Sequence, residues 1–234
     1  MLGLVAKRSR QLELDLREAP RWGGRRAGAG RKRAANPRDP HRARPAFPGR
    51  FPCHVTLKVR PGLPSLRTVK LVRELERTLA DACERGRFRV AHYSIQHDHV
   101  HLIVEATSKH ALACGMKSIG SRVARAVNRI FARHGPVLSD RYHRHTLRAP
   151  REVRNAIAYV LQNARRHLVK TGRRPPAASV DPASSGRWFA GWIHRIQPAS
   201  SSRPPPVSKP RTWLLAIGWR RHGLIDPAEV PGSL

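Results

Sequence analysis

Residues 95–105 read Ile-Gln-His-Asp-His-Val-His-Leu-Ile-Val-Glu, in which apolar and polar side chains alternate. Successive side chains of an extended strand point to opposite faces, so this alternation predicts a strand with one face on a core. Three apolar residues fall on the core face: Val100, Leu102 and Val104. His97, His99 and His101 share the other face, where neighbouring imidazoles would offer a divalent metal two nitrogen ligands. An edge strand with surface histidines would show the same pattern in a chain with 13 histidines.

A second stretch, residues 153–168, has the apolar spacing of a helix. Its apolar stripe consists of Val153, Ile157, Val160, Leu161, Ala164 and Leu168. At about 100° per residue, Tyr159 lies far round from this stripe, and Asn163, four residues on, lies beside Tyr159. Core packing therefore does not explain Tyr159, although an exposed tyrosine on a helix is common.

The two stretches together resemble a known family. The pair His99-Val100-His101 followed by an apolar strand, and then a helix with Tyr159-Val-Leu-Gln-Asn163, is similar to the single-tyrosine HUH transposases, most of all the REP-associated tyrosine transposases. The resemblance covers residues 50–170. The histidine pair alone is weakly specific, but the pair, the Tyr-x-x-x-Asn helix and the order of elements are together fairly specific. His97 stands where the family usually has a proline, so which histidines bind metal stays open.

The resemblance implies a metal-dependent DNA endonuclease and strand transferase that acts on hairpin-forming single-stranded DNA. Tyr159 would attack a backbone phosphorus and form a 5′-phosphotyrosine intermediate. A Mg²⁺ or Mn²⁺ ion held by His99 and His101 would polarise the phosphate. The third ligand of the family falls on Asn163.

Two other functions stay open. A nucleic-acid-binding protein that has lost catalysis would have the same charge and aromatic residues, but it would not need the histidine pair, Tyr159 and Asn163. A metal-dependent phosphodiesterase that uses water would keep the histidines and not need Tyr159. Tyr142 is a competing nucleophile, although it does not have an Asn four residues later.

The net charge points to a polyanionic partner. The chain has 46 Lys and Arg against 15 Asp and Glu, a formal net charge of +31, and nucleic acid is the obvious partner for it. Four arginines form a basic stripe on a helix predicted over residues 108–134, without acidic partners: Arg122, Arg125, Arg129 and Arg133. We expect these arginines and Arg166 to contact DNA, although a solvated helix face would look similar.

Several features of the sequence bear on location. No apolar run is long enough to span a bilayer, and the first residues lack the apolar segment of a secretion signal. Cys53, Cys83 and Cys114 contain no Cys-x-x-Cys pair, which indicates reduced, buried cysteines in a cytoplasmic protein. The protein would act as a monomer or a homodimer.

The predicted elements give an α+β fold. Beside the histidine strand we expect three strands, within residues 51–60, 88–96 and 137–147, and helices within residues 65–86 and 108–134. With the tyrosine helix, which has Pro150 in its first turn, the order is β-α-β-β-α-β-α. The first six elements of this order follow the ferredoxin-like pattern, in which an antiparallel sheet has two helices on one face. The histidines would lie on the other face, and the last helix would bring Tyr159 to them.

We expect three parts in the chain. Residues 1–50 form a basic, flexible N-terminal tail. A solvated arm without sequence preference explains this composition more simply than a segment that binds the backbone or minor groove of DNA. Residues 51–170 form the HUH-like domain. Residues 171–234 form a linker rich in Pro and Ser and a short basic element with Trp213 and Trp219, which could stack on bases but more commonly would dock on the chain's own domain.

Overall fold

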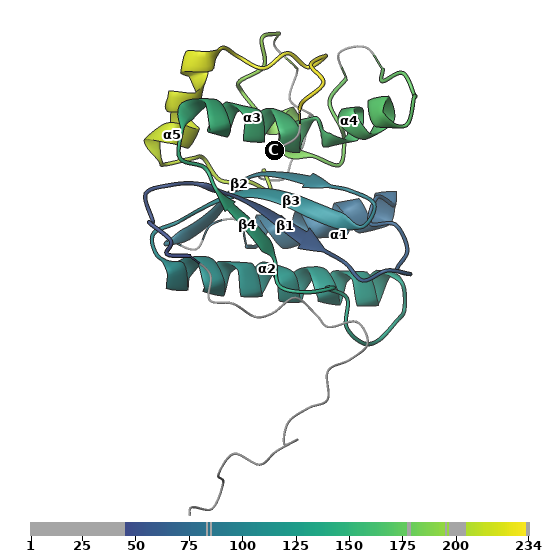
Figure 1. Ribbon diagram of the computed structural model, residues 1–234. Coiled ribbons are helices and arrows are strands. Elements are labelled where there is room, and N and C mark those ends of the chain that lie inside the picture. The colour runs from purple at the N-terminus through teal and green to yellow at the C-terminus, as the bar shows by residue number, and fades with distance from the viewer. Residues whose placement is uncertain are drawn as a thin grey trace, which may run out of the picture. The chain divides into compact units, whose positions relative to one another are not determined.

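The histidine strand lies within a sheet of four antiparallel strands in the order β2-β3-β1-β4. The strands are β1 (Cys53–Lys58), β2 (Phe88–Ile95), β3 (His99–Ala106) and β4 (His143–Thr146). The helices α1 (Val69–Ala80) and α2 (Lys109–Ile130) cover one face of this sheet (Figure 1). Chain order and strand order are those of the ferredoxin-like pattern, so the predicted α+β fold is confirmed.

This computed structural model describes residues 45–82, 84, 86–176, 179–194, 196 and 205–232. The described residues belong to one unit, which runs from Pro45 to Leu234. The predicted N-terminal tail lies outside the described residues up to position 44, and so does Cys83.

Side-chain caps determine where the two helices of the first layer begin. Ser108 accepts a hydrogen bond from a backbone amide of α2, as predicted. The start of α1 differs from the prediction, because Thr68 and not Ser65 caps it. The hydroxyl of Thr68 accepts from the amide of Leu71 at 3.4 Å, whereas that of Ser65 accepts from Arg67 at 3.2 Å, in the turn before the helix. Both helices also end several residues earlier than predicted.

The main core lies between the sheet and these two helices. The three apolar residues of the histidine strand are buried in it, as predicted, with Leu75 of α1 and Ile119 of α2. Cys53 is also buried there, but Cys114 lies on an exposed part of α2, so its predicted burial is wrong.

The other face of the sheet is covered by α3 (Pro150–Leu161), which α4 (Asn163–Lys170) follows (Figure 1). Pro150 occupies the first turn of α3, as predicted. The prediction of one continuous helix through residue 168 is wrong. Gln162 leaves the helical conformation, with φ −115° and ψ 18°, and separates the two helices. Its side-chain amide donates to the carbonyl of Asp226, so the bend is tied to the C-terminal part of the chain.

Residues from the C-terminal part of the chain form hydrogen bonds with the outer edge of β2. Ile95 of β2 donates its amide to the Ala183 carbonyl at 2.8 Å, and Ser208 donates its amide to the Val90 carbonyl at 2.8 Å. Edge strands present unpaired amides and carbonyls, so these contacts satisfy part of that edge. The region predicted as a linker therefore includes residues in regular contact with the sheet.

A second core lies between the sheet, α3 and two short helices, α5 (Trp213–Ala216) and η2 (Gly218–His222), whereas the short helix η1 (Ser185–Trp188) packs on β2. Its members include Ile157, Val160, Trp192, Leu215, Trp219 and Ile225. Trp219 is only 2% exposed, which confirms that it docks on the domain, whereas Trp213 is 47% exposed. Buried Glu105 anchors this segment, because its carboxylate accepts from the amides of Arg211 and Thr212 at 2.9 and 2.8 Å.

Across the residues that the structure describes, no helix combines the length and the apolar character needed to cross a membrane.

Candidate functional site

The predicted histidine pair lies on β3, on the sheet face opposite α1 and α2. The Nε2 atoms of His99 and His101 are 2.9 Å apart, so both rings converge on one point. Two ligand nitrogens about 2.1 Å from a metal and at a right angle to each other would be about 3.0 Å apart. The spacing of the pair is therefore that of two ligands of one ion.

The Nδ1 atom of His99 lies 2.7 Å from Oδ1 of Asp98. A carboxylate in this place holds the proton on Nδ1 and leaves Nε2 with its lone pair. His99 thus presents Nε2 as an acceptor or a metal ligand.

The Nδ1 atom of His101 lies 3.0 Å from Nε2 of His54 and 3.2 Å from Oγ1 of Thr56. Burial, and then His54 and His99, lower the pKa of His101 to about 2. Burial, and then other histidines, lower the pKa of His54 to about 4. Both rings are therefore neutral at neutral pH, the form in which an imidazole binds a metal.

Tyr159 lies over this cluster. It is partly buried on α3, and its ring centroid is 5.2 Å from that of His101 and 5.8 Å from that of His54, both edge-on. The guanidinium carbon of Arg166 lies 5.5 Å from the centroid of the Tyr159 ring. The structure thus brings the predicted nucleophile, the histidine pair and one predicted DNA-binding arginine together.

Asn163 is the first residue of α4 and not part of the helix that carries Tyr159, because of the bend at Gln162. It is 1% exposed, and neither its Oδ1 nor its Nδ2 has a hydrogen-bond partner. A buried amide without partners is costly, so its oxygen is available to a ligand.

Other acidic and metal-binding side chains do not complete the site. In the described part of the chain, no three side chains of His, Cys, Asp or Glu gather in a way that would hold a metal ion. A metal on the histidine pair would therefore need an oxygen of another kind. The free amide of Asn163 fits this need.

Two alternatives from the sequence lie elsewhere. His97 does not share the face of the pair, because β3 begins at His99 and His97 is an exposed residue of the turn before it. Tyr142 packs against the core on the α1 and α2 side. The converging nitrogens therefore belong to His99 and His101, and Tyr159 is the tyrosine beside them.

The four arginines of the basic stripe are not part of this site, because α2, which carries Arg122, Arg125 and Arg129, lies on the other side of the sheet (Figure 1) and Arg133 follows its end. The expectation that they have no acidic partners is wrong. Arg129 pairs with Glu74 of α1, and Arg122 lies 3.5 Å from Asp81 at the end of α1. The sequence did not reveal these pairs, because partners on a neighbouring helix are distant in the chain.

Two further histidines lie at this site and were not predicted from the sequence, His54 and His167. His54 lies on β1, whose alternation places His54, Thr56 and Lys58 on one face, and the register of β1 with β3 sets Thr56 opposite His101. This alternation could have revealed His54 once β1 was paired with β3. The ring centroid of His167, on α4, lies 6.4 Å from that of His99.

Comparison with known family models finds a match to part of the chain. The family model described as "Transposase IS200 like" matches residues 64–163, from the turn before α1 to Asn163. No curated protein matches the chain.

Two solved structures are similar to it. One is a REP-associated tyrosine transposase bound to a REP hairpin, with 16% identity, a TM-score of 0.48, and coverage of 67% of this chain and 94% of that chain. The other is a protein of Deinococcus radiodurans described as a candidate transposase, with 15% identity, a TM-score of 0.36, and coverage of 53% and 92%. By the family match, residues 64–163 are similar to the transposases that the IS200-like family model describes.

Proposed function

We propose that this domain cleaves and rejoins single-stranded DNA, with Tyr159 as the nucleophile. One observation carries the proposal: the ring of Tyr159 lies edge-on over His101, whose Nε2 converges with that of His99 at 2.9 Å. A protein that only binds DNA needs no such cluster beneath a tyrosine. The IS200-like family match supports the same reading.

The reaction is an exchange of phosphate esters. The phenolic oxygen of Tyr159 forms a bond to a backbone phosphorus, and the bond from that phosphorus to the 3′ oxygen breaks. The products are a 5′-phosphotyrosine and a free 3′-hydroxyl, which receives the proton that the phenol gives up. A covalent intermediate keeps the ester bond, so the reverse reaction reseals the strand without ATP.

His99, His101 and the amide oxygen of Asn163 would hold a Mg²⁺ or Mn²⁺ ion. When bound, such an ion acts as a Lewis acid on a non-bridging phosphate oxygen. Hard divalent ions prefer oxygen ligands, which supports Asn163 as the third ligand. The pairing of His99 with Asp98 and of His101 with His54 keeps both rings in place.

The substrate we propose is a hairpin-forming single strand. The net charge of +31 supports a polyanion. The guanidinium carbon of Arg166 lies 5.5 Å from the centroid of the Tyr159 ring, which supports a contact of this arginine with the phosphate that the tyrosine would attack.

Tyr159→Phe tests the nucleophile, because it removes one oxygen and keeps the ring that packs on His101. Incubated with hairpin DNA and Mg²⁺ or Mn²⁺, the wild type should form an adduct that survives denaturation, and Tyr159→Phe should form none, with strand transfer reduced by at least about a thousandfold. Tyr142→Phe is the matched control and should behave as wild type.

The other outcomes identify the rival functions. Cleavage that continues in Tyr159→Phe would mean that water is the nucleophile. A wild type that binds DNA and never cleaves it would be a binding protein. An adduct in Tyr159→Phe would contradict the assignment and direct attention to Tyr142.

A further inference from the structure

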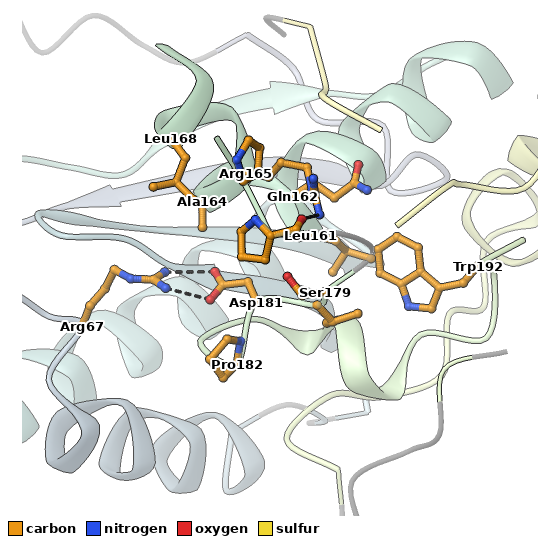
Figure 2. Close-up of a pocket in the computed structure, with 13 residues that line it drawn as sticks. Arg67, Leu161, Gln162, Ala164, Arg165, Leu168, Ser179, Asp181, Pro182 and Trp192 are labelled. Carbon is orange, nitrogen blue, oxygen red and sulfur yellow. Dashed lines mark hydrogen bonds and ion pairs between the residues drawn. The ribbon is translucent and has the colours of Figure 1, made fainter. Parts of the chain in front are cut away.

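A cavity of about 220 Å³ lies beside the junction of α3 and α4 (Figure 2). Its apolar lining includes Leu161, Ala164, Leu168, Val180, Pro182 and Trp192. The space equals that of about seven molecules of liquid water, which suits a single heterocyclic ring system and not a base pair. Trp192 adds an aromatic ring to the wall, and it is itself 6% exposed.

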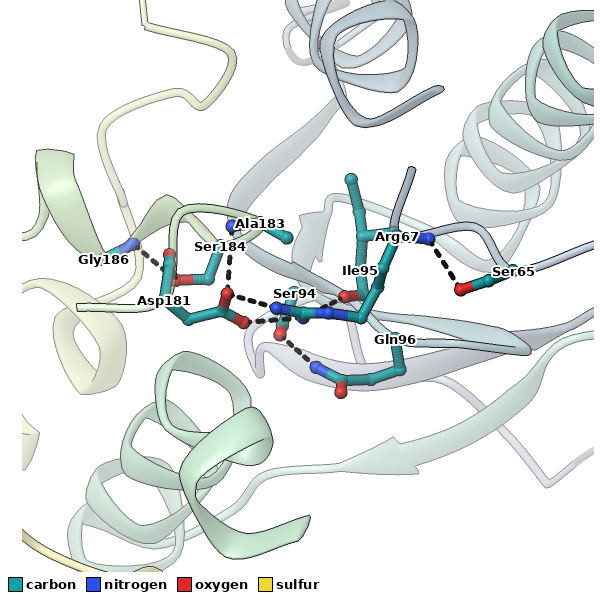
Figure 3. A network of polar contacts seen from close by, with 9 residues as sticks. All are labelled: Ser65, Arg67, Ser94, Ile95, Gln96, Asp181, Ala183, Ser184 and Gly186. Carbon is teal, nitrogen blue, oxygen red and sulfur yellow. Dashed lines mark hydrogen bonds and ion pairs between the residues drawn. The ribbon is translucent and has the colours of Figure 1, made fainter. Parts of the chain in front are cut away.

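The far wall of the cavity is held by an ion pair. Arg67 donates to both carboxylate oxygens of Asp181, at 2.9 and 2.7 Å, and also to the Ile95 carbonyl at 2.8 Å (Figure 3). Asp181 accepts in addition from the Ala183 amide at 3.0 Å. These contacts fasten the wall to β2, so the cavity is formed before any ligand arrives.

Gln162 supplies a polar group to the lining and connects the cavity with the catalytic cluster. It is 4% exposed, and its Oε1 has no hydrogen-bond partner, while its Nε2 donates to Asp226. A buried acceptor without a donor is costly, and the edge of a ligand could provide that donor. Asn163 follows directly, and Tyr159 is three residues earlier.

The chain around the cavity is strongly basic. Between Asn163 and Pro176 it contains six basic side chains and no acidic one: Arg165, Arg166, His167, Lys170, Arg173 and Arg174. The carboxylate of Asp181 is paired with Arg67. Arg165 itself lines the cavity and donates to the Pro176 carbonyl at 2.7 Å. An apolar cavity within such a segment favours a ligand with a flat uncharged part and a polyanionic chain.

We propose that the cavity holds one unstacked nucleobase of the single-stranded substrate, close to the phosphate that Tyr159 attacks. The inference rests on the proposed function. The base would lie against Trp192 and the proline rings, its edge would donate to Oε1 of Gln162, and the basic side chains of α4 would contact the adjoining phosphates. Proteins that bind single strands commonly combine basic side chains on the backbone with an aromatic side chain on which a base stacks.

A double-mutant cycle between protein and DNA tests the inference. Ala164→Leu places a larger side chain in the cavity and suits a helix. The DNA is a fluorescein-labelled hairpin with single-stranded flanks, in which each flank nucleotide is replaced in turn by an abasic one. Affinity is measured by fluorescence anisotropy, so cleavage is not required.

If a base occupies the cavity, one abasic position should weaken binding to the wild type about tenfold and leave binding to Ala164→Leu unchanged. Ala124→Leu, on α2 across the sheet, is the matched control and should show the wild-type pattern. Additive effects at every flank position, or coupling in Ala124→Leu as well, would overturn the inference. Leu168→Phe fills the same cavity, and it replaces Ala164→Leu if circular dichroism shows that the latter is unfolded.

This result is independent of the proposed chemistry. An adduct on Tyr159 without any coupled position would overturn the base pocket and leave the proposed function intact. A coupled position without an adduct would support the pocket and count against Tyr159 as the nucleophile.

Discussion

His54 touches two groups of the proposed reaction at once. Its Nε2 lies 3.0 Å from Nδ1 of His101, and its ring centroid lies 5.8 Å from that of Tyr159. A metal-binding histidine usually has a partner on its second nitrogen, and for His101 that partner is a neutral imidazole and not a carboxylate. We expect His54 to orient the ligand and to support the ring of the nucleophile.

Removing these histidines should change metal affinity in a graded way. His99→Ala and His101→Ala should each abolish Mn²⁺ binding, because each removes a ligand. His54→Ala should weaken Mn²⁺ binding by about tenfold to a hundredfold, the range for a residue that orients a ligand. His54→Gln, whose amide can still accept from His101, should recover part of the loss. Electron paramagnetic resonance of Mn²⁺ measures free and bound metal directly.

His97→Ala is the control for that series, because His97 is exposed in the turn before β3. It should bind Mn²⁺ as the wild type does. If His54→Ala also binds Mn²⁺ with unchanged affinity, His54 has no orienting role. If His97→Ala loses binding as His99→Ala does, the ligand pair is assigned wrongly.

For single residues, the sequence could predict the pair of candidate metal ligands, His99 and His101, but not the side chains that contact this pair. The alternation of residues 99–105 is a local property and correctly separates buried apolar residues from the histidines. It fails at His97, because the Gln96 amide bonds to the His99 carbonyl at 2.8 Å and closes a turn there. His54 enters the site only through strand pairing, which connects residues that are distant in the chain.

Among the elements, α3 is held from two sides. The sheet lies under it, and on its outer side Arg154 donates to both carboxylate oxygens of Glu229 at 2.9 and 2.8 Å. Arg166 donates to the Pro231 carbonyl at 3.1 Å. The C-terminal segment therefore keeps the tyrosine helix on the histidine cluster.

Two tryptophans of that segment allow a matched test. Trp219→Ala should lower the free energy of unfolding by about 3–5 kcal/mol, because it empties a buried position against α3. Trp213→Ala should change it by less than about 1 kcal/mol, because half of that side chain is already in solvent. Urea denaturation followed by circular dichroism measures both. Equal losses for the two variants would contradict the docking of Trp219 on α3.

Periodicity predicted most elements correctly but misjudged their ends and the C-terminal segment. The bend at Gln162 and the contacts of Glu105 with residues 211 and 212 depend on partners far away in the chain. Composition indicated a linker, because proline and serine are abundant there. A few buried anchors were sufficient to fix parts of that segment to the domain.

For the molecule as a whole, charge is the dominant property. Many of the carboxylates in the described residues are paired with arginines, among them Glu74, Glu76, Glu84, Asp181 and Glu229. Each of these pairs neutralises one arginine, so the excess of 31 positive charges lies on the other Lys and Arg. DNA binding should therefore depend strongly on salt.

Each phosphate neutralised on a single strand contributes about −0.7 to the slope of log affinity against log salt. Deleting residues 1–44, the unit before Pro45, should make this slope shallower and leave formation of the tyrosine adduct intact. Anisotropy titrations at several NaCl concentrations measure the slope. A slope that does not change would show that this part of the chain does not contact DNA.

The pairing of β2 with residues from the end of the described chain also bears on how the protein is made. Translation proceeds from the N-terminus, and domains begin to fold during synthesis. Until residues 183 and 208 have left the ribosome, the amide of Ile95 and the carbonyl of Val90 have no strand-edge partners. The outer side of α3 likewise stays exposed to solvent until Trp219 and Glu229 have been synthesised and can pack on it. We therefore expect α3 to be supported on both sides, with Tyr159 fixed over the histidines, only after these residues have been synthesised.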